Sequence, residues 1–143
     1  MTERTTVHLL RHGEVYNPDK ILYGRLPDFH LSDLGQQMAV LAADALEGRE
    51  IAEIWSSPLD RAQETAAPLA GRLGLTPVID DRIIEADNVF EGQRVSVGDG
   101  VLRQPRAWRY LYNPFRPSWG EPYKDVAARM RSAVTSARRS VRG

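Results

Sequence analysis

The sequence has no cysteine and almost no lysine. The absence of Cys excludes disulfides, thiolate nucleophiles and cysteine metal sites. Lys20 and Lys124 are the only lysines, so arginine supplies nearly all of the positive charge, and its planar guanidinium matches the geometry of phosphate. The 19 basic residues are balanced by 19 acidic ones, so no global field favours nucleic acid or an anionic membrane as a partner. Any affinity for anions must therefore come from arginine at particular places.

Long hydrophobic runs are also missing. No apolar stretch approaches 18 residues, and the N-terminus has no signal-peptide core. These absences make a cytoplasmic protein without a membrane partner the default expectation. The chain has 143 residues, of which 42% are hydrophobic and 27% charged, a composition typical of one globular domain, here spanning residues 1–143.

Apolar runs and helical periodicity alternate along the first half of the chain. Strands are predicted for residues 5–11, 51–55 and 77–79, and helices for residues 32–47 and 58–74. Ser32 is the expected N-cap of the first helix and Gly48 its stop, while Pro58 is expected at the first position of the second helix. This order predicts an α/β three-layer sandwich, with a mostly parallel sheet and helices on both faces.

Apolar residues at spacings of three and four indicate which face of each helix is buried. The first helix should bury Leu34, Met38, Leu41 and Ala45, and the second Leu59, Ala62, Ala66, Leu69 and Leu73, with a kink at Pro68. Residues 14–31 read as a long loop, which in a compact domain is usually functional or disordered. A short helix is expected from Pro105 within residues 103–112, then a loop over 113–122 and an amphipathic helix over 123–141.

Two basic sites follow the first two strands. The first strand ends at Arg11-His12-Gly13, and ligands of open α/β sheets bind at the carboxyl ends of strands. Gly13 allows a sharp turn that a Cβ would obstruct. Arg61 lies in the first turn of the second helix, where the helix dipole also favours an anion. Taken alone, Arg61 could equally be a solvated surface charge.

Three motifs in order give these residues a family context. They are Leu-Leu-Arg-His-Gly-Glu at 9–14, Leu-Ser-Asp-Leu-Gly at 31–35 and Ser-Ser-Pro-Leu-Asp-Arg-Ala-Gln-Glu-Thr-Ala at 56–66. The sequence resembles the histidine phosphatase superfamily, also called phosphoglycerate mutase-like proteins. The resemblance implies that His12 becomes a phosphohistidine and that Arg11 and Arg61 clamp the phosphoryl group, without metal or other cofactor. Asn17 and Gly24 are expected at the phosphate and substrate site, although Asn17 lies one residue nearer the histidine than is common.

The resemblance also assigns a proton donor. Glu85 matches the carboxyl group that protonates the leaving oxygen, and Glu14, Glu91 and Glu121 are its rivals. We interpret Glu14 as structural, Glu91 as shaping its loop, and Glu121 as a first-turn charge of the last helix.

A second pocket histidine of the family has no match here. His8 is expected to pack within the first strand and His30 to lie on a surface loop. Because the family pattern places that histidine on a later strand, we expect residues 1–143 to lack a C-terminal strand and helix. Uncovered sheet and helix surface would then be apolar and would favour association, for instance as a homodimer.

The leading functional prediction is a phosphomonoester hydrolase that acts through phosphohistidine on His12 and takes a small-molecule phosphate ester. A phosphoglycerate mutase is the enzymatic alternative, but residues 86–92 do not match the segment that grips its substrate. A module that binds phosphate ligands with little turnover is the third possibility. Arginines and aromatics within residues 86–122 could bind a sugar or nucleotide, or could pack this region onto the sheet. They are Arg103, Arg106, Trp108, Tyr110, Tyr112 and Trp119.

Overall fold

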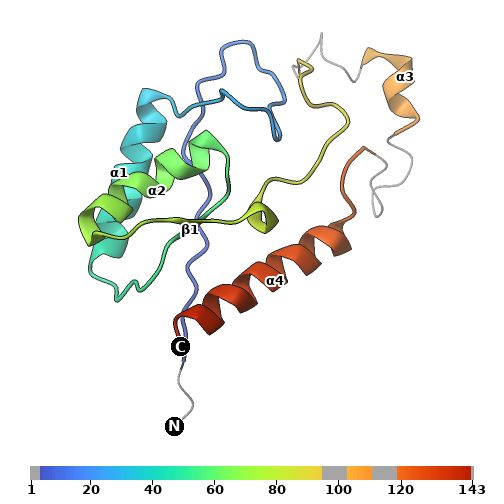
Figure 1. Ribbon diagram of the computed structural model, residues 1–143. Helices are drawn as coiled ribbons and strands as arrows, with labels where there is room; N and C mark the ends of the chain where they lie inside the picture. Colours follow the sequence, from blue (N-terminus) through green and yellow to red (C-terminus); the bar gives the residue numbers. More distant parts are fainter. Residues whose placement is uncertain (1–3, 95–102, 111–118, 143) are drawn as a thin grey trace.

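The computed structural model describes residues 4–94, 103–110 and 119–142 (Figure 1). In chain order its elements are α1 (Asp33–Glu47), β1 (Trp55–Ser56), α2 (Asp60–Leu73), β2 (Val78–Ile79), the 3-10 helix η1 (Asp81–Ile83), α3 (Pro105–Trp108) and α4 (Tyr123–Ser140). The two strands are parallel, with Trp55 opposite Val78 and Ser56 opposite Ile79. In Figure 1, α1 and α2 lie side by side on one side of β1, and α4 runs along the other. This arrangement confirms the α/β class.

The helix α1 begins and ends where the sequence predicts, but it buries a different face. The Ser32 hydroxyl caps it by accepting a hydrogen bond from the Gly35 amide, and Gly48 ends it. Its buried residues are Gly35, Ala39 and Ala43, whereas the larger Leu34, Met38 and Leu41 are exposed. The predicted inner face is therefore wrong. Its small residues let the backbone of α1 approach its neighbours closely, and this close approach outweighs the burial of the leucine stripe.

Residues 5–11 do not form the predicted buried strand. Leu9 is 78% exposed and Leu10 55%, and His8 is exposed rather than packed. A strand needs a hydrogen-bonded neighbour, and among the described residues no strand pairs with this segment. The same limit shortens the second predicted strand, because β1 pairs only with the two residues of β2. Leu9 and Leu10 are therefore exposed apolar side chains instead of members of a buried strand.

The helix α2 begins at Asp60, two residues after the predicted start. Leu59 is its N-cap, with φ −72° and ψ 137°, so Pro58 precedes the helix instead of opening it. Pro68 lies inside the helix, which continues to Leu73. Its most buried positions include Arg61, Thr65 and Leu69, while Ala62 and Ala66 are half-buried. Two polar side chains thus occupy a face where apolar residues would be expected.

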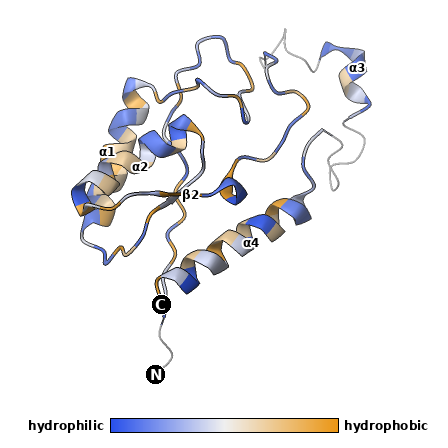
Figure 2. Cartoon of the chain, in the orientation of Figure 1, coloured by the Kyte–Doolittle hydropathy of each residue, from blue (hydrophilic) through white to orange (hydrophobic). Residues whose placement is uncertain are grey.

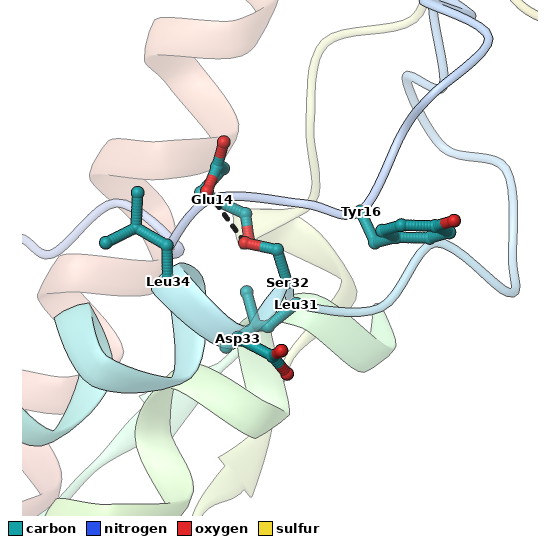
Figure 3. Close-up of a pocket in the computed structure, with 6 residues that line it drawn as sticks. All are labelled: Glu14, Tyr16, Leu31, Ser32, Asp33 and Leu34. Carbon is teal, nitrogen blue, oxygen red and sulfur yellow. Dashed lines mark hydrogen bonds between the residues drawn. The ribbon is translucent and has the colours of Figure 1, made fainter.

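Contacts between its two ends close the long loop over residues 14–31 next to the start of α1. Val15 and Leu31 form an antiparallel bridge, and the Ser32 amide donates to the Glu14 carbonyl at 2.9 Å. The Glu14 carboxylate accepts a hydrogen bond from the Ser32 hydroxyl at 2.8 Å (Figure 3). The structural interpretation of Glu14 fits these contacts.

The second half of the chain packs through aromatic residues. Phe90 and Ala107, the latter on the predicted short helix α3, form a buried cluster that Leu22, Tyr110 and Trp119 pack against. In this cluster Tyr110 and Trp119 pack against Phe90 and Ala107, not against β1 or β2 as the packing interpretation expected. Trp108 is exposed, and Tyr112 lies outside the described residues. The helix α4 covers nearly the predicted range, and Figure 2 shows hydrophobic and hydrophilic residues alternating along it. None of the helices within the described ranges is both long and apolar enough to span a membrane.

Two glycines are required by close backbone approach. A Cβ on Gly13 would lie 2.5 Å from the Gly35 carbonyl oxygen, and a Cβ on Gly35 would overlap the Glu14 carbonyl oxygen. We predict that Gly35→Ala lowers the free energy of unfolding by about 1–3 kcal/mol, because the backbone must move to relieve this overlap. Urea denaturation followed by circular dichroism measures the change.

Gly71 provides the matched control, because it lies inside α2 and a Cβ there would meet nothing within 4 Å. Gly71→Ala should leave stability unchanged or raise it by up to about 1 kcal/mol, through the better helix propensity of alanine. Equal effects of the two substitutions would contradict the close approach at Gly35.

Candidate active site

His12 faces Glu85 across a short distance. The His12 side chain is 10% exposed, and its Nε2 lies 3.1 Å from the Glu85 Oε1. Its Nδ1 lies 2.8 Å from the Gly13 carbonyl oxygen. A carbonyl only accepts, so Nδ1 carries a hydrogen and the lone pair of a neutral ring is on Nε2. Nε2 is therefore the ring nitrogen that faces the Glu85 carboxyl group.

Arg61, on α2, lies close to the Glu85 carboxyl group that faces His12. Its side chain is 1% exposed, and its Nε lies 3.9 Å from the Glu85 Oε1. The terminal nitrogens donate to two loop carbonyls, Nη1 to Leu26 at 3.3 Å and Nη2 to Gly24. Among the described residues, Arg61 Nε is the buried side-chain nitrogen or oxygen that has no hydrogen-bond partner. The surface-charge interpretation of Arg61 is therefore wrong, and Nε is the guanidinium donor left facing the His12–Glu85 pair.

Thr65 joins the histidine segment to α2. The Gly13 amide donates to the Thr65 hydroxyl at 3.0 Å, and that hydroxyl donates to the Arg61 carbonyl one turn earlier at 2.7 Å. One buried side chain thus fixes the residue after His12 against the turn of α2 that carries Arg61.

The other predicted site residues have different surroundings. Arg11 is exposed, and its side chain has no hydrogen bond or ion pair within the described parts of the chain. The Asn17 amide group donates to the Ile21 carbonyl and accepts from the Ile21 amide, at 2.8 and 3.0 Å. Gly24 has φ +42°, and its carbonyl binds Arg61. The structure therefore brings His12, Glu85 and Arg61 together, whereas among the described residues no hydrogen bond or ion pair joins the side chain of Arg11 or Asn17 to them.

Tyr23 lies beside Arg61 and His12, although no motif in the sequence singles it out. The Arg61 guanidinium lies over the Tyr23 ring, 4.7 Å from its centroid, and the ring meets the His12 ring edge-on, with 6.2 Å between the ring centroids. Phe29 packs on Tyr23, with 5.3 Å between their centroids. Both aromatic rings come from the loop over residues 14–31, which therefore covers the buried guanidinium on this side through a contact between distant segments.

Behind Glu85, two arginines converge on its backbone. Arg25 Nε and Arg129 Nη2 donate to the Glu85 carbonyl, at 2.8 and 3.2 Å. Both also pair with the Glu121 carboxylate, through Arg25 Nη2 at 3.0 Å and Arg129 Nε at 2.8 Å. Arg129, followed by Arg25, lowers the pKa of Glu121 below its ordinary value of 4.5. Glu121 precedes α4, whose N-cap is Pro122, and it binds these arginines instead of acting as a first-turn charge.

The remaining candidates lie at the edge of the loop. His30 is exposed, as the sequence predicts, and its Nδ1 lies 2.5 Å from the Glu64 Oε1. The hydrogen bond with Glu64 raises the pKa of His30 above 6.5. Glu91 accepts a hydrogen bond from the Arg25 amide at 3.0 Å, which fits its interpretation as a residue that shapes the loop.

Two further features lie apart from His12. A shallow open hollow of about 390 Å³ beside the start of α1 is lined by Glu14, Tyr16, Leu31, Ser32, Asp33 and Leu34 (Figure 3). In the described part of the chain, possible metal-ligand atoms of Asp28, His30 and Asp60 lie within 4.8 Å of one another. All three side chains are at least partly exposed, and neither feature includes His12, Glu85 or Arg61.

An imidazole, a carboxyl group opposite it and a buried guanidinium thus lie together in this structure. Residues 7–143 match the model of the histidine phosphatase superfamily (branch 1), and the chain belongs to this family. It is 59% identical to the uncharacterized protein Rv0525 of Mycobacterium tuberculosis over 143 residues, which cover all of this chain and 70% of that protein.

Two solved structures of mycobacterial glucosyl-3-phosphoglycerate phosphatase Rv2419c share the fold. The complex with inorganic phosphate has a TM-score of 0.68 at 33% identity, over 87% of this chain and 58% of that chain. The complex with VO3 has a TM-score of 0.72 at 34% identity, over 90% of this chain and 62% of that chain. The present chain therefore spans about three fifths of the length of these solved relatives.

The Glu121 ion pairs predict how stability depends on pH. Because the pKa of Glu121 is lowered in the folded state, its ionisation stabilises the fold above pH 4.5, and this contribution is lost as the pH falls through the lowered pKa. Wild type should therefore be more stable than Glu121→Gln at pH 6, and the difference should shrink below pH 4.5. Urea denaturation of both proteins between pH 3 and 7 measures it, and a difference that grows on acidification would contradict the ion pairs.

Proposed function

We propose that this chain carries the active site of a phosphomonoester hydrolase that works through a phosphohistidine on His12. The observation that carries the proposal is the opposition of His12 Nε2 and Glu85 Oε1 at 3.1 Å, with Nδ1 bound to the Gly13 carbonyl. This arrangement turns Nε2 of His12 towards the Glu85 carboxyl group, so the nucleophile and the proton donor of the proposed reaction lie side by side. The phosphatase relatives that share the fold support the same chemistry.

The first chemical step uses the Nε2 lone pair of His12 and a proton from Glu85. The Nε2 lone pair of His12 forms a bond to phosphorus while the bond from phosphorus to the ester oxygen breaks. Glu85 gives its proton to the departing oxygen, which leaves as an alcohol. The ester must enter between the two side chains, so substrate binding separates the direct contact that they make in the free protein.

The second step returns the site to its starting state. Water attacks the phosphohistidine, a bond from oxygen to phosphorus forms, and the N–P bond breaks. Glu85, now a carboxylate, takes the proton of the attacking water, and inorganic phosphate leaves. Arg61 Nε, which lacks a partner and lies 3.9 Å from Glu85, is placed to donate to a phosphoryl oxygen as negative charge shifts during both steps.

Arg11 would add a second positive charge. Its guanidinium is next to His12 in the chain and is exposed, so a phosphate dianion at Nε2 would draw it inward by charge-assisted hydrogen bonding. The substrates proposed for the site are small-molecule phosphate esters.

Labelled phosphate tests the covalent intermediate. After mixing with a ³²P-labelled aryl phosphate and rapid quenching at high pH, the protein should retain acid-labile label, and His12→Asn should retain none. His8→Asn is the matched control, because His8 is exposed and should leave labelling unchanged. A wild-type chain that takes up no label from any aryl phosphate would overturn the proposal, and interconversion of 2- and 3-phosphoglycerate in a parallel assay would favour a mutase.

Glu85→Gln tests the proton donor. The amide cannot give up a proton, so the rate of phosphoenzyme formation from an alkyl phosphate, whose leaving group is poor, should fall about 10²- to 10⁴-fold. Phosphoenzyme formation from an aryl phosphate with a good leaving group should fall much less, because that group needs little protonation. Rapid-quench measurement of this first step with the two substrates gives the contrast, and equal losses would remove Glu85 from the role of proton donor.

A further inference from the structure

The backbone of Glu85 is held by side chains that do not touch His12. We propose that Arg25, Glu121 and Arg129 form a positioning unit that sets the distance between the Glu85 carboxyl group and His12. The inference rests on the proposed function, because it takes Glu85 as the proton donor. None of the three is proposed as a catalytic residue, since their contacts run to the carbonyl of Glu85 and leave its carboxyl group free.

Arg129 makes the most extensive of these contacts. From α4 it donates through Nη1 to the carbonyls of Arg82 and Ile84, both at 2.7 Å. Its Nη2 donates to the Glu85 carbonyl at 3.2 Å and to the Glu121 Oε2 at 2.9 Å. One guanidinium therefore holds the chain across the residues that lead into Glu85, which requires its planar fork of donors.

Arg25 holds the same carbonyl of Glu85 from the loop over residues 14–31. Its Nε donates to the Glu85 carbonyl at 2.8 Å, and its Nη2 donates to Glu121 at 3.0 Å. Its chain neighbours Gly24 and Leu26 give their carbonyls to Arg61. Residues 24–26 thus bind both Arg61 and the backbone of Glu85. This short segment connects Arg61, the proposed donor to a phosphoryl oxygen, with Glu85, the proposed proton donor.

Burial makes these contacts stronger than ordinary surface ion pairs. The side chains of Arg129 and Glu121 are 17% and 18% exposed, and the pair between them is bidentate. Charge-assisted bidentate contacts fix geometry as well as adding energy. A displacement of about 1 Å can cost about 10²-fold in rate. Loss of this unit should therefore slow proton transfer from Glu85 even in a variant that remains folded.

The test compares two substrates in variants of α4. In Arg129→Met, the rate of phosphoenzyme formation from an alkyl phosphate should fall about 10²-fold, whereas the rate from an aryl phosphate should stay within about threefold, and the ester concentration that gives half of the maximal rate should change little for both. Arg129→Lys keeps the charge but not the fork, so it should recover only part of the loss. Arg131→Met is the matched control, because it removes the same charge from an exposed position of α4 and should behave as wild type.

Glu121→Gln is a milder variant for the case in which Arg129→Met does not fold, and it should show the same substrate contrast to a smaller degree. Equal losses with the alkyl and aryl phosphates would overturn the inference, since a merely structural role predicts them. A wild-type chain without phosphoenzyme would instead overturn the proposed function, so the two failures are distinguishable.

The position of Glu85 is also measured without turnover. The ¹⁵N signal of His12 Nε2 at fixed pH reports its polar contact with the Glu85 carboxyl group at 3.1 Å, and Glu85→Gln supplies the reference for a changed contact. In Arg129→Met this signal should move from the wild-type position towards that reference. An unchanged signal would overturn the positioning role whether or not the chain turns over substrate.

Discussion

The 3.1 Å contact between His12 Nε2 and Glu85 Oε1 depends on long-range interactions of both segments. Neither residue belongs to a helix or strand, so each depends on neighbours for its position. Thr65 of α2 holds the segment of His12 through the Gly13 amide, and Arg129 of α4 holds the segment of Glu85. The helices α2 and α4 therefore each fix one partner of this contact.

The unusual preference for arginine over lysine has a structural counterpart. Arg25, Arg61 and Arg129 each donate to main-chain carbonyls, and each of them contacts more than one segment or group. An ammonium is a compact point charge, whereas a guanidinium presents up to five donors in fixed directions. In this fold, arginine acts as a cross-link between irregular segments that have few ladder hydrogen bonds of their own.

Motifs and helix signals in the sequence carried most of the prediction. The helix ends at Ser32 and Gly48 follow from local capping, and His12, Glu85 and Arg61 could be placed together from the family pattern. The strand over residues 5–11 could not, because strand formation depends on a partner elsewhere in the chain. The buried face of α1 was missed because periodicity weighs hydrophobicity, whereas this helix is packed through glycine and alanine. Contacts of arginine with distant carbonyls have no local pattern at all.

The loop that binds Arg61 does so through the carbonyls of Gly24 and Leu26. Every amino acid provides such an acceptor, so this contact places no demand on the side chain at position 26. Gly24 is different, because its φ of +42° and the nearness of Glu91 leave no room for a Cβ. Other side chains of this loop can therefore change, and with them the shape of the loop surface, without altering the backbone carbonyls that hold the buried Arg61 guanidinium.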